Sequence, residues 1–562
     1  MSPDGGPTQR RPRGPGFANA SVSLVMFIAL LAFSLSPSRQ TPPAIAEFAP
    51  QPREQITEAP DSQTSEFGSG EGGEAIIEYV GADDEEPPPP PTPPPVVEET
   101  LVPPEARTRR CVGDPPRQIE DPQSPPCVAF WDGEDNGGAT YKGVTADTIR
   151  IAVPWQEAGP GQGATDRTPE LVALETFFND RFEFYGRKLQ LIPFAAHGTG
   201  EPEPQLQIAD AVTADEELQV FASMPRADLS GADYHYYHEL ARRGIVGVYS
   251  GWGTSVTEAQ LRALHPYEWM IIPSSQDIAA NMAEWACKNL MGRPVEYATQ
   301  FNGGDRTYGL VYIRYVDGTV LDLEPFRKRA AECGIEFAAE VEIPSDDMPA
   351  GSQGAILAMQ TEGVTTVFSM VQAVAQDLFL WPAASQQQYR PEWFVSSIGS
   401  ATSDAAALFA PKDQLPSVFG LHYENKMQLA PDRPVNWALK EVDPSLSGDA
   451  ALDKYTYWPL LILASGIQWA GPNLTPQTFG AVLQSLDFPN PGASAAPYFQ
   501  ATVGFRDSHA FFNDGTPVWF NPAQVSNETG QPGAFCFVDR GLRYRLGQWP
   551  DTPAALFQGP CY

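Results

Sequence analysis

Residues 141–155, YKGVTADTIRIAVPW, decide the fold of this chain. A turn is followed by a short run rich in β-branched residues (Thr148, Ile149, Ile151 and Val153), and the run enters a loop rich in glycine and proline. An apolar strand that leads into a loop and then a helix is typical of a buried parallel sheet. The same strand–loop–helix order recurs after this point, which predicts parallel sheets with right-handed crossovers.

Two series of alternating strands and helices follow one another. The first runs from the strand at 148–153 to WMIIP at 269–273, and the second from a helix at 277–290 to the strand WFVSS at 393–397. The tail adds a strand at 418–423, helices at 449–470 and 476–485, and short strands near the end. Two series in succession predict an α/β fold with two doubly wound lobes, which together span residues 141–562.

The start of the chain has the pattern of an export segment. Arg10, Arg11 and Arg13 precede the apolar run SVSLVMFIALLAFSLS at 21–36, and AIA at 44–46 offers a cleavage site. A basic flank followed by an apolar run is typical of a signal peptide or an uncleaved signal-anchor, although the run is shorter than the ~20 residues of a spanning helix. Residues 1–46 are therefore predicted to be one or the other. In both cases the rest of the chain is exported, either anchored to the cell membrane or secreted.

Residues 47–140 are predicted to be a linker. Up to residue 110 the composition is Pro, Glu, Ser, Thr and Gly, including EEPPPPPTPPPVVEE. Such a segment cannot bury enough apolar surface to offset its conformational entropy, so we expect it to be disordered. Its proline run favours an extended polyproline II spacer. Residues 111–136 form a proline-rich lead-in to the folded unit.

The six cysteines indicate disulfides. No CxxC motif is present, which gives no support to a zinc ribbon or a thioredoxin-type site, and export favours disulfide formation. Six cysteines allow many connectivities. The pairing of neighbours in sequence is Cys111 with Cys127, Cys287 with Cys333, and Cys536 with Cys561.

The sequence gives little support to catalysis, metal binding or nucleic-acid binding. GxSxG is absent, and the few histidines have no marked Ser or Cys partner, so we predict no enzyme and no cofactor. His235, His238 and Glu239 match neither HExxH nor HxxEH, and we interpret them as part of a solvated helix with no metal. GPGQG at 159–163 is interpreted as a flexible loop. The formal charge of −34 disfavours nucleic acid as a partner.

One local motif is interpreted as purely structural. Ser255 and Glu258 have the spacing of a capping box at the start of the helix that ends near Leu264.

The strand GVTADTIRIAV at 143–153 and the order of the elements resemble the type I extracytoplasmic solute-binding proteins, of the leucine/isoleucine/valine-binding kind. The resemblance covers about residues 141–539. It implies two lobes joined by three hinge segments, with the ligand in the cleft between the lobes. The implied first lobe is about 143–272 and 398–496, the second about 273–397 and 497–562, and the hinges lie near 272–274, 397–399 and 497–504.

The resemblance also places a ligand at the loops after the carboxyl ends of the strands, as the rule for open α/β sheets requires. Relatives hold a ligand carboxylate with a small hydroxyl residue and with backbone N–H groups, which bind anions well at helix N-termini. The residues at these positions in the first lobe are Trp155, Ser223, Met224, Ser250, Gly251, Trp252 and Thr254. In the second lobe they are Tyr315 and Gln372.

One departure from the family bears on the ligand. Amino-acid-binding relatives place an acidic residue directly after the strand at 393–397, to pair the ligand ammonium. Here the loop reads SSIGSATSD, and Asp404 comes several residues late. A buried ammonium without a carboxylate is costly, so an amino-acid ligand is not expected. Trp155 and Trp252 suit a flat apolar, aromatic or sugar-like ligand instead.

The resemblance implies that the protein binds a small solute outside the cytoplasm and delivers it to an ABC permease. The alternative is a sensory or scaffold module, held at the membrane by the N-terminal segment, that uses the same fold without transport. The long spacer favours this alternative.

Overall fold

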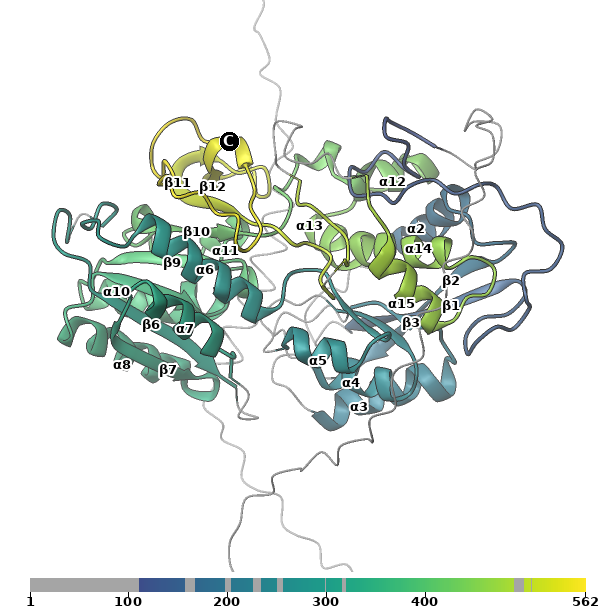
Figure 1. The fold of residues 1–562 in the computed structure, drawn as a ribbon, viewed down its shortest axis with the longest axis horizontal. Coiled ribbons are helices and arrows are strands. Elements are labelled where there is room, and N and C mark those ends of the chain that lie inside the picture. Colours follow the sequence, from purple (N-terminus) through teal and green to yellow (C-terminus); the bar gives the residue numbers. More distant parts are fainter. Residues whose placement is uncertain are drawn as a thin grey trace, which may run out of the picture. The chain divides into compact units, whose positions relative to one another are not determined.

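The computed structural model describes residues 111–156, 167–197, 204–225, 234–249, 256–298, 300–315, 320–489, 500–506 and 508–562 (Figure 1). The predicted export segment and the linker up to residue 110 lie outside these ranges. Within the described ranges, no helix combines the length and the apolar character needed to cross a membrane.

The first sheet has five parallel strands in the order β2-β1-β3-β4-β5. The strands are β1 (Thr148–Gln156), β2 (Lys188–Ala196), β3 (Ala222–Ser223), β4 (Val246–Tyr249) and β5 (Glu268–Met270). Between them lie α2 (Thr168–Arg181), α3 (Pro204–Val212), α4 (Tyr234–Arg242) and α5 (Glu258–Ala263). The consecutive residues Ile151, Ala152 and Val153 of β1 are all buried, as expected of a strand covered on both faces.

The second sheet has seven strands in the order β12-β11-β10-β9-β8-β6-β7. Five are parallel: β6 (Tyr308–Arg314), β7 (Phe337–Pro344), β8 (Thr366–Met370), β9 (Glu392–Ser396) and β10 (Val418–His422). β11 (Thr516–Val525) and β12 (Pro532–Phe537) are antiparallel additions at one edge. The helices of this part are α6 (Ser275–Asn289), α7 (Glu324–Glu332), α8 (Met348–Thr361), α9 (Ala373–Ala375), α10 (Trp381–Gln386) and α11 (Asp404–Ala407).

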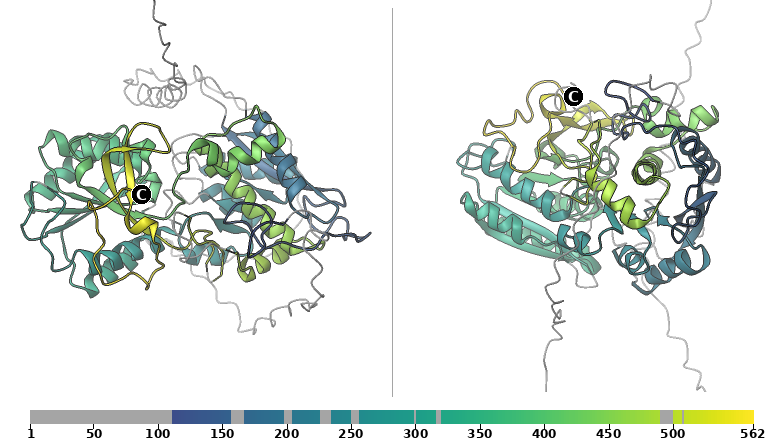
Figure 2. Two further views of the ribbon diagram at one scale, coloured as in Figure 1. Left: turned by 90° about the horizontal axis from the view of Figure 1, so that it is seen from above. Right: turned by 45° about the vertical axis from the view of Figure 1, so that its right-hand side comes forward.

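The helices that follow β10 return to the first sheet. They are α12 (Pro434–Val442), α13 (Ala450–Leu452), α14 (Trp458–Ala470) and α15 (Pro476–Ser485). The ring of Trp437 on α12 lies 5.4 Å from that of Phe177 on α2, and Phe479 on α15 lies 6.0 Å from Phe221, next to β3. These light green helices accompany the blue first sheet in every view (Figures 1 and 2). Within the described residues, three connections therefore join the two sheets: residues 271–274, residues 423–433, and the segment between 486 and 515, of which 486–489, 500–506 and 508–515 are described.

β10 differs in its placement from the expected lobes. Residues 398–496 are assigned above to the first lobe, yet Phe419 of β10 is in register with Phe394 of β9 and with Trp519 of β11, all in the second sheet. The hinge expected near 397–399 thus lies between two neighbouring strands of one sheet. The crossing comes after His422 instead, because β10 completes its hydrogen bonds within the second sheet before the chain leaves it. The remaining lobe boundaries stay a prediction.

The crossing segments are hydrogen-bonded to one another. Between the first and third, the Phe512 amide donates to Ile271 O (2.8 Å), and just before the first crossing the Met270 amide of β5 donates to His509 O (2.7 Å). In the second and third, the Ala501 amide donates to Asn425 Oδ1 (2.8 Å). These bonds hold the crossings as one bundle rather than as separate linkers.

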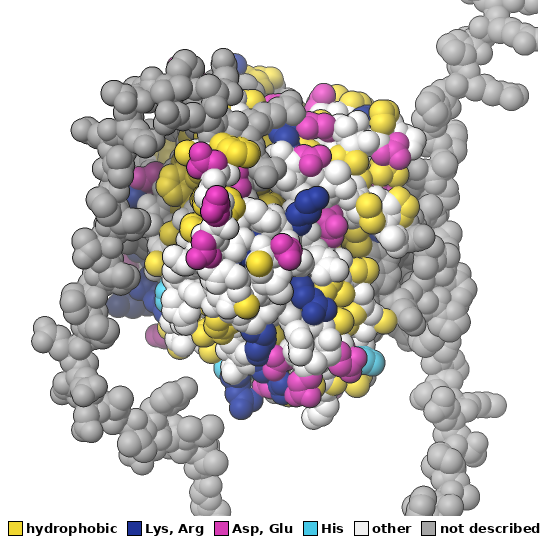
Figure 3. All heavy atoms as spheres, turned by 90° about the vertical axis from the view of Figure 1, so that its right-hand side faces the viewer, with side chains coloured by type: hydrophobic (Ala, Val, Ile, Leu, Met, Phe, Trp, Pro, Cys, Tyr) yellow, Lys and Arg dark blue, Asp and Glu magenta, His cyan; other side chains and the backbone are white. Residues whose placement is uncertain are grey.

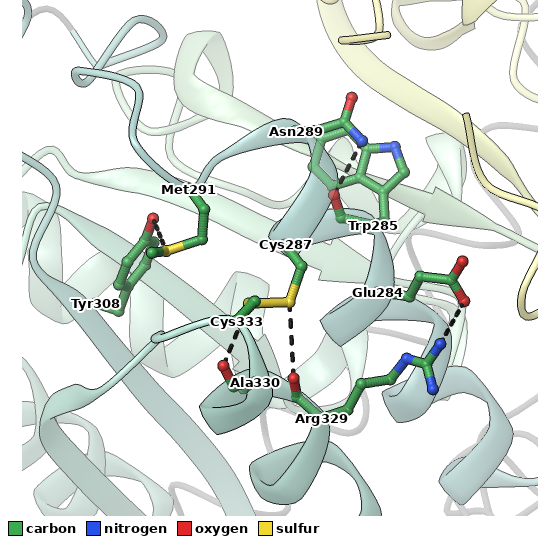
Figure 4. Close-up of a disulfide and its surroundings, with 9 residues drawn as sticks. All are labelled: Glu284, Trp285, Cys287, Asn289, Met291, Tyr308, Arg329, Ala330 and Cys333. Carbon is green, nitrogen blue, oxygen red and sulfur yellow. Dashed lines mark hydrogen bonds and ion pairs between the residues drawn. A yellow bond between two sulfur atoms is a disulfide. The ribbon is translucent and has the colours of Figure 1, made fainter. Parts of the chain in front are cut away.

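All three disulfides expected from the sequence are present: Cys111–Cys127, Cys287–Cys333 and Cys536–Cys561. The second joins α6 to the end of α7, beside the ion pair in which Arg329 Nη2 lies 3.1 Å from Glu284 Oε2 (Figure 4). The third fastens the end of the chain to β12, where the Phe537 amide also donates to Tyr562 O (3.1 Å).

The predicted capping box is shifted by two residues. The N-cap of α5 is Thr257, whose hydroxyl accepts from the Gln260 amide (3.1 Å) while Gln260 Oε1 accepts from the Thr257 amide (2.8 Å). Ser255 lies outside the described residues. Thr257 and Gln260 have the same local pattern as Ser255 and Glu258, so the pattern alone does not choose between them.

The close approach of β9 and β10 makes Gly420 intolerant of a side chain. A Cβ at Gly420 would lie 2.0 Å from Val395 O, whereas a Cβ at Gly354, on the exposed side of α8, meets no atom within 4 Å. We expect Gly420→Ala to lower the free energy of unfolding by about 1–3 kcal/mol through overpacking. Gly354→Ala should instead raise it by up to about 1 kcal/mol through helix propensity. Urea denaturation measures the stability of both variants. If Gly420→Ala unfolded at the same urea concentration as the wild type, the result would contradict the pairing register of β9 and β10.

Candidate ligand-binding site at the carboxyl ends of the strands

The carboxyl ends of β6, β8, β9 and β10 share one edge of the second sheet, because these strands are parallel neighbours. In an open α/β sheet this edge is where ligands bind. The residues that follow the four strands are Tyr315, Val371 and Gln372, Ser397, and Tyr423.

The structure brings together the two residues predicted for the second lobe. Gln372 Nε2 donates a hydrogen bond to Tyr315 Oη, and so links the loops after β6 and β8. Gln372 is 8% exposed and Tyr315 is half-buried. Behind them, Ser369 Oγ donates to Gln376 Oε1 (2.9 Å), which fixes the start of the helical segment after β8. Tyr315 and Gln372 therefore place a phenol and an amide at the carboxyl edge of the sheet, on loops that are held by hydrogen bonds.

A second polar cluster, not foreseen from the sequence, lies at the ends of β9 and β10. Ser397 Oγ accepts from the Tyr423 amide (3.0 Å) and lies 3.2 Å from Thr402 Oγ1, which is 2.9 Å from His422 Nδ1. Burial lowers the pKa of His422 well below its ordinary value, and the positive charges of Arg543 and Lys454 lower it further. The imidazole is therefore neutral at neutral pH, and this cluster carries no net charge of its own.

Just beyond it, Glu424 and Lys454 form a buried ion pair. Lys454 Nζ lies 2.6 Å from Glu424 Oε2, and both side chains are largely enclosed. Burial alone would lower the pKa of Lys454, but the charge of Glu424 raises it above its ordinary value. Glu424 belongs to the second crossing and Lys454 precedes α14, so the pair fastens that crossing to the helices of the first sheet.

Asp404, the acidic residue that comes late in its loop, is occupied by structural bonds. Its carboxylate accepts from the Phe535 amide and from Ser526 Oγ, each at 2.7 Å. These bonds tie the start of α11 to β12. A carboxylate engaged in this way is not available for the ammonium group of a ligand at the loop after β9.

In the first sheet, Ser223 and Met224 are fully buried at the end of β3. Ser223 Oγ lies 2.7 Å from Tyr236 Oη, and Tyr237 Oη donates to Met224 O (3.3 Å). Both tyrosines come from α4 and cover this end of the strand. Ser223 is therefore buried behind the carboxyl end of β3 and not exposed at it. Its hydroxyl lies next to Tyr236, a residue that sequence reasoning missed.

The other predicted residues of the first lobe stay predictions. The backbone of Trp155 is paired with Ala195 near the end of β1. The side chain of Trp155 and the loop after β4, with Ser250, Gly251, Trp252 and Thr254, lie outside the described residues.

Of the cluster considered for a metal, Glu239 is engaged in ion pairs at the end of α4. Glu239 accepts from Arg242 Nη1 and Arg243 Nε, both at 2.8 Å. In the described ranges, no group of three or more His, Cys, Asp or Glu side chains is arranged to hold a metal ion.

Positively and negatively charged side chains are interspersed on the face of the protein drawn in Figure 3.

One hollow of about 600 Å³ lies at the opposite end of the second sheet. Tyr308 and Phe337, which begin β6 and β7, belong to its lining, together with Arg293, Asp305 and Glu336. This position is the amino edge of the strands, so the hollow is separate from the candidate site.

The comparisons with known proteins bear on the fold alone. No family model matches the chain, and no relative is found among curated proteins. An ABC transporter substrate-binding protein from Sphaerobacter thermophilus matches 72% of this chain and 100% of its own, with 14% identity and a TM-score of 0.51. The fold is that of the type I periplasmic binding proteins. The fold class expected from the sequence is thereby confirmed.

Two further solved structures superpose less closely. A possible leucine/isoleucine/valine-binding protein from Rhodopirellula baltica SH 1 has 10% identity, 70% and 97% coverage of the two chains and a TM-score of 0.48. A solute binding protein of an ABC transporter from R. palustris, in complex with 4-hydroxybenzoate, has 12% identity, 72% and 98% coverage and a TM-score of 0.48.

The burial of Asp404 predicts a pH dependence of stability. Burial raises the pKa of its carboxyl to about 6, and the nearby charge of Glu528 contributes to the rise. Because the folded pKa exceeds the unfolded one, the native state binds more protons between pH ~4 and ~6, and the free energy of unfolding falls as pH rises through this window.

We expect Asp404→Asn to remove this part of the slope, on the order of 2–3 kcal/mol across the window. Urea denaturation from pH 4 to pH 8 measures it. Asp132→Asn, at an exposed aspartate, is the matched control. Equal slopes for the two variants would contradict the assignment.

Proposed function

We propose that this protein is exported and binds a small solute in a cleft between its two lobes. The observation that carries the proposal is the arrangement of two sheets, each with five parallel strands, joined by three crossings. The third crossing is hydrogen-bonded to both others, and buried polar clusters lie at the carboxyl ends of the strands. In such an arrangement a ligand that contacts both lobes at once favours the closed form, because each lobe contributes contacts that the open form lacks.

Several residues are proposed to contact the ligand. Tyr315 and Gln372 supply hydrogen bonds from the second lobe. The loop after β4, with Ser250, Gly251, Trp252 and Thr254, and the end of β1, with Trp155, supply contacts from the first. Ser223 and Met224 are enclosed by α4, so their proposed part is to hold the end of β3 in place.

The proposed ligand is flat and apolar, aromatic or sugar-like, and not an amino acid. The engagement of Asp404 with Phe535 and Ser526 supports this, because the loop after β9 then offers no carboxylate for a buried ammonium. The two tryptophans of the first-lobe loops would supply flat apolar surface.

The proposed partner is an ABC permease that recognises the closed form, as the name of the Sphaerobacter thermophilus protein with the same fold suggests. The alternative is a sensory or scaffold module held at the membrane by the apolar run at 21–36. The long proline-rich spacer between that run and residue 111 favours it. Measuring uptake of the identified ligand by cells that lack the protein distinguishes the two roles. Transport predicts that these cells lose uptake, whereas a scaffold predicts that uptake is unchanged.

The binding site is tested first by a thermal-shift screen of the full-length protein against aromatic acids, sugars and amino acids. A ligand bound by the native state alone raises the unfolding midpoint with its concentration. We expect aromatic or sugar ligands to do so. A strong shift with amino acids would contradict the proposed ligand class, and no shift with any member would count against a small-solute site of these classes.

The role of the Tyr315–Gln372 pair is tested by Gln372→Ala. Loss of one ligand hydrogen bond should weaken the affinity for the ligand found in the screen by about 10-fold, as measured by calorimetry. The matched control is Gln353→Ala on α8, where the side-chain amide donates to Gln386 Oε1 (2.9 Å) and accepts from Gln387 Nε2 (2.8 Å) on the outer surface. Equal affinities for the two variants would place the ligand elsewhere.

A further inference from the structure

The lead-in before β1 reaches the crossing segments. Between Cys111 and Cys127 the chain doubles back on itself: the Val112 and Arg117 amides each donate to the other's carbonyl oxygen (2.9 and 2.8 Å), and the Gln118 amide donates to Pro125 O (2.9 Å). A turn at 121–124 closes the loop, with the Gln123 amide bonded to Asp121 Oδ1 (2.8 Å). Gln123 stands at the tip of this disulfide-closed hairpin.

The tip is enclosed in the protein. Gln123 and Ser124 have no exposed surface, and Ile119 belongs to the main core. Asp121 Oδ2 accepts from Tyr457 Oη (3.0 Å), which anchors the turn just ahead of α14. A solvated lead-in would need none of these contacts, so the hairpin is an integral part of the fold.

Gln123 joins two of the three crossings through its side-chain amide. Its Nε2 donates to Asn425 Oδ1 (2.6 Å) and to Ala501 O (3.1 Å), and Asn425 Nδ2 donates back to Gln123 Oε1 (2.7 Å). Asn425 lies in the second crossing and Ala501 in the third. The bonds form a closed ring, because Asn425 Oδ1 also accepts from the Ala501 amide.

We propose that the hairpin 111–127 is a brace for the hinge and that Gln123 is its positioning residue. Any bending that separates the second crossing from the third must break bonds to this one amide. The Cys111–Cys127 disulfide keeps the hairpin closed and so keeps the tip in place. The brace thereby limits the range of interlobe angles of the protein without ligand. This inference rests on the proposed function in one respect, that the lobes move about these crossings.

The chain offers a matched control within the same hairpin. Gln118 is as buried as Gln123, but its Nε2 donates to Arg181 O, at the end of α2 in the first lobe. Gln118→Met and Gln123→Met remove comparable buried amides of one loop. Only the second variant removes side-chain hydrogen bonds to the two crossings.

The experiment measures the distribution of interlobe distances by pulsed electron paramagnetic resonance on the full-length protein without ligand. Spin labels are placed on Val172→Cys of α2 and Leu357→Cys of α8, which are 58% and 60% exposed in the two lobes. All six native cysteines are in disulfides, so the labels attach to the introduced cysteines. Amide hydrogen exchange at residues 423–426 and 500–503 is followed in parallel.

We expect Gln123→Met and the double variant Cys111→Ser/Cys127→Ser to broaden the distance distribution. Both should speed exchange at the two crossings by about 10-fold, as the loss of a local stabilising bond predicts. Gln118→Met should leave the distribution and the exchange at the crossings as in the wild type. Equal behaviour of Gln123→Met and Gln118→Met would overturn the brace.

If Gln123→Met does not fold, a second pair of variants tests the inference by swapping the side chains of Gln123 and Asn425. Gln123→Asn/Asn425→Gln preserves the summed length of the pair, whereas Gln123→Asn alone is too short. The double variant should therefore give a narrower distribution than the single one, and the opposite order would overturn the brace. The ligand screen is separate: if no ligand shifts the midpoint but Gln123→Met broadens the distance distribution, the result counts against a site for these solute classes and leaves the brace standing.

Discussion

Arg543 makes the buried contact on which the joining of the two lobes depends. Its Nε lies 2.7 Å from Asp514 Oδ1, its Nη2 donates to Tyr423 O (2.6 Å), and its Nη1 donates to Glu424 O (3.1 Å). Both charged side chains are nearly inaccessible to water, so the ion pair persists only because further hydrogen bonds satisfy the guanidinium. The same group thereby fixes the carbonyls of the second crossing against the segment that enters β11.

The apolar core continues across the crossings. One buried cluster contains Phe221 next to the first sheet and Phe419 of the second, and the ring of Trp458 on α14 lies 5.2 Å from Phe512 in the third crossing. The crossings thus share one buried apolar cluster with the sheets they join. A bundle of this kind can bend at its ends, but it cannot come apart without exposing core residues.

Local patterns predicted the elements well and their partners less well. The strand expected at 148–153 is β1 (Thr148–Gln156), and the one expected at 393–397 is β9 (Glu392–Ser396). The strand expected at 418–423 is also real, but nothing in its apolar run states which sheet it joins. That choice is made by hydrogen bonds to β9 and β11, the latter about a hundred residues away.

The candidate site shows the same limit. The rule that ligands bind after the carboxyl ends of strands was sufficient to select Tyr315 and Gln372, which meet in the structure. It also selected Ser223, whose hydroxyl turns to Tyr236 because α4 covers that strand end. The pairing of Gln123 with Asn425 spans most of the folded chain, and no spacing in the sequence reveals such a contact.

The disulfide that fastens the end of the chain to β12 has a consequence for association between molecules. β12 is the outermost strand of its sheet, and such a margin can recruit an extended segment from another copy. Here the Tyr562 carbonyl already accepts from the Phe537 amide, and Cys561 is covalently attached to Cys536. A strand from another molecule would have to displace the segment at Cys561 and Tyr562, which the disulfide holds beside β12. Polymerisation through the edge of β12 is therefore disfavoured while the disulfide is intact.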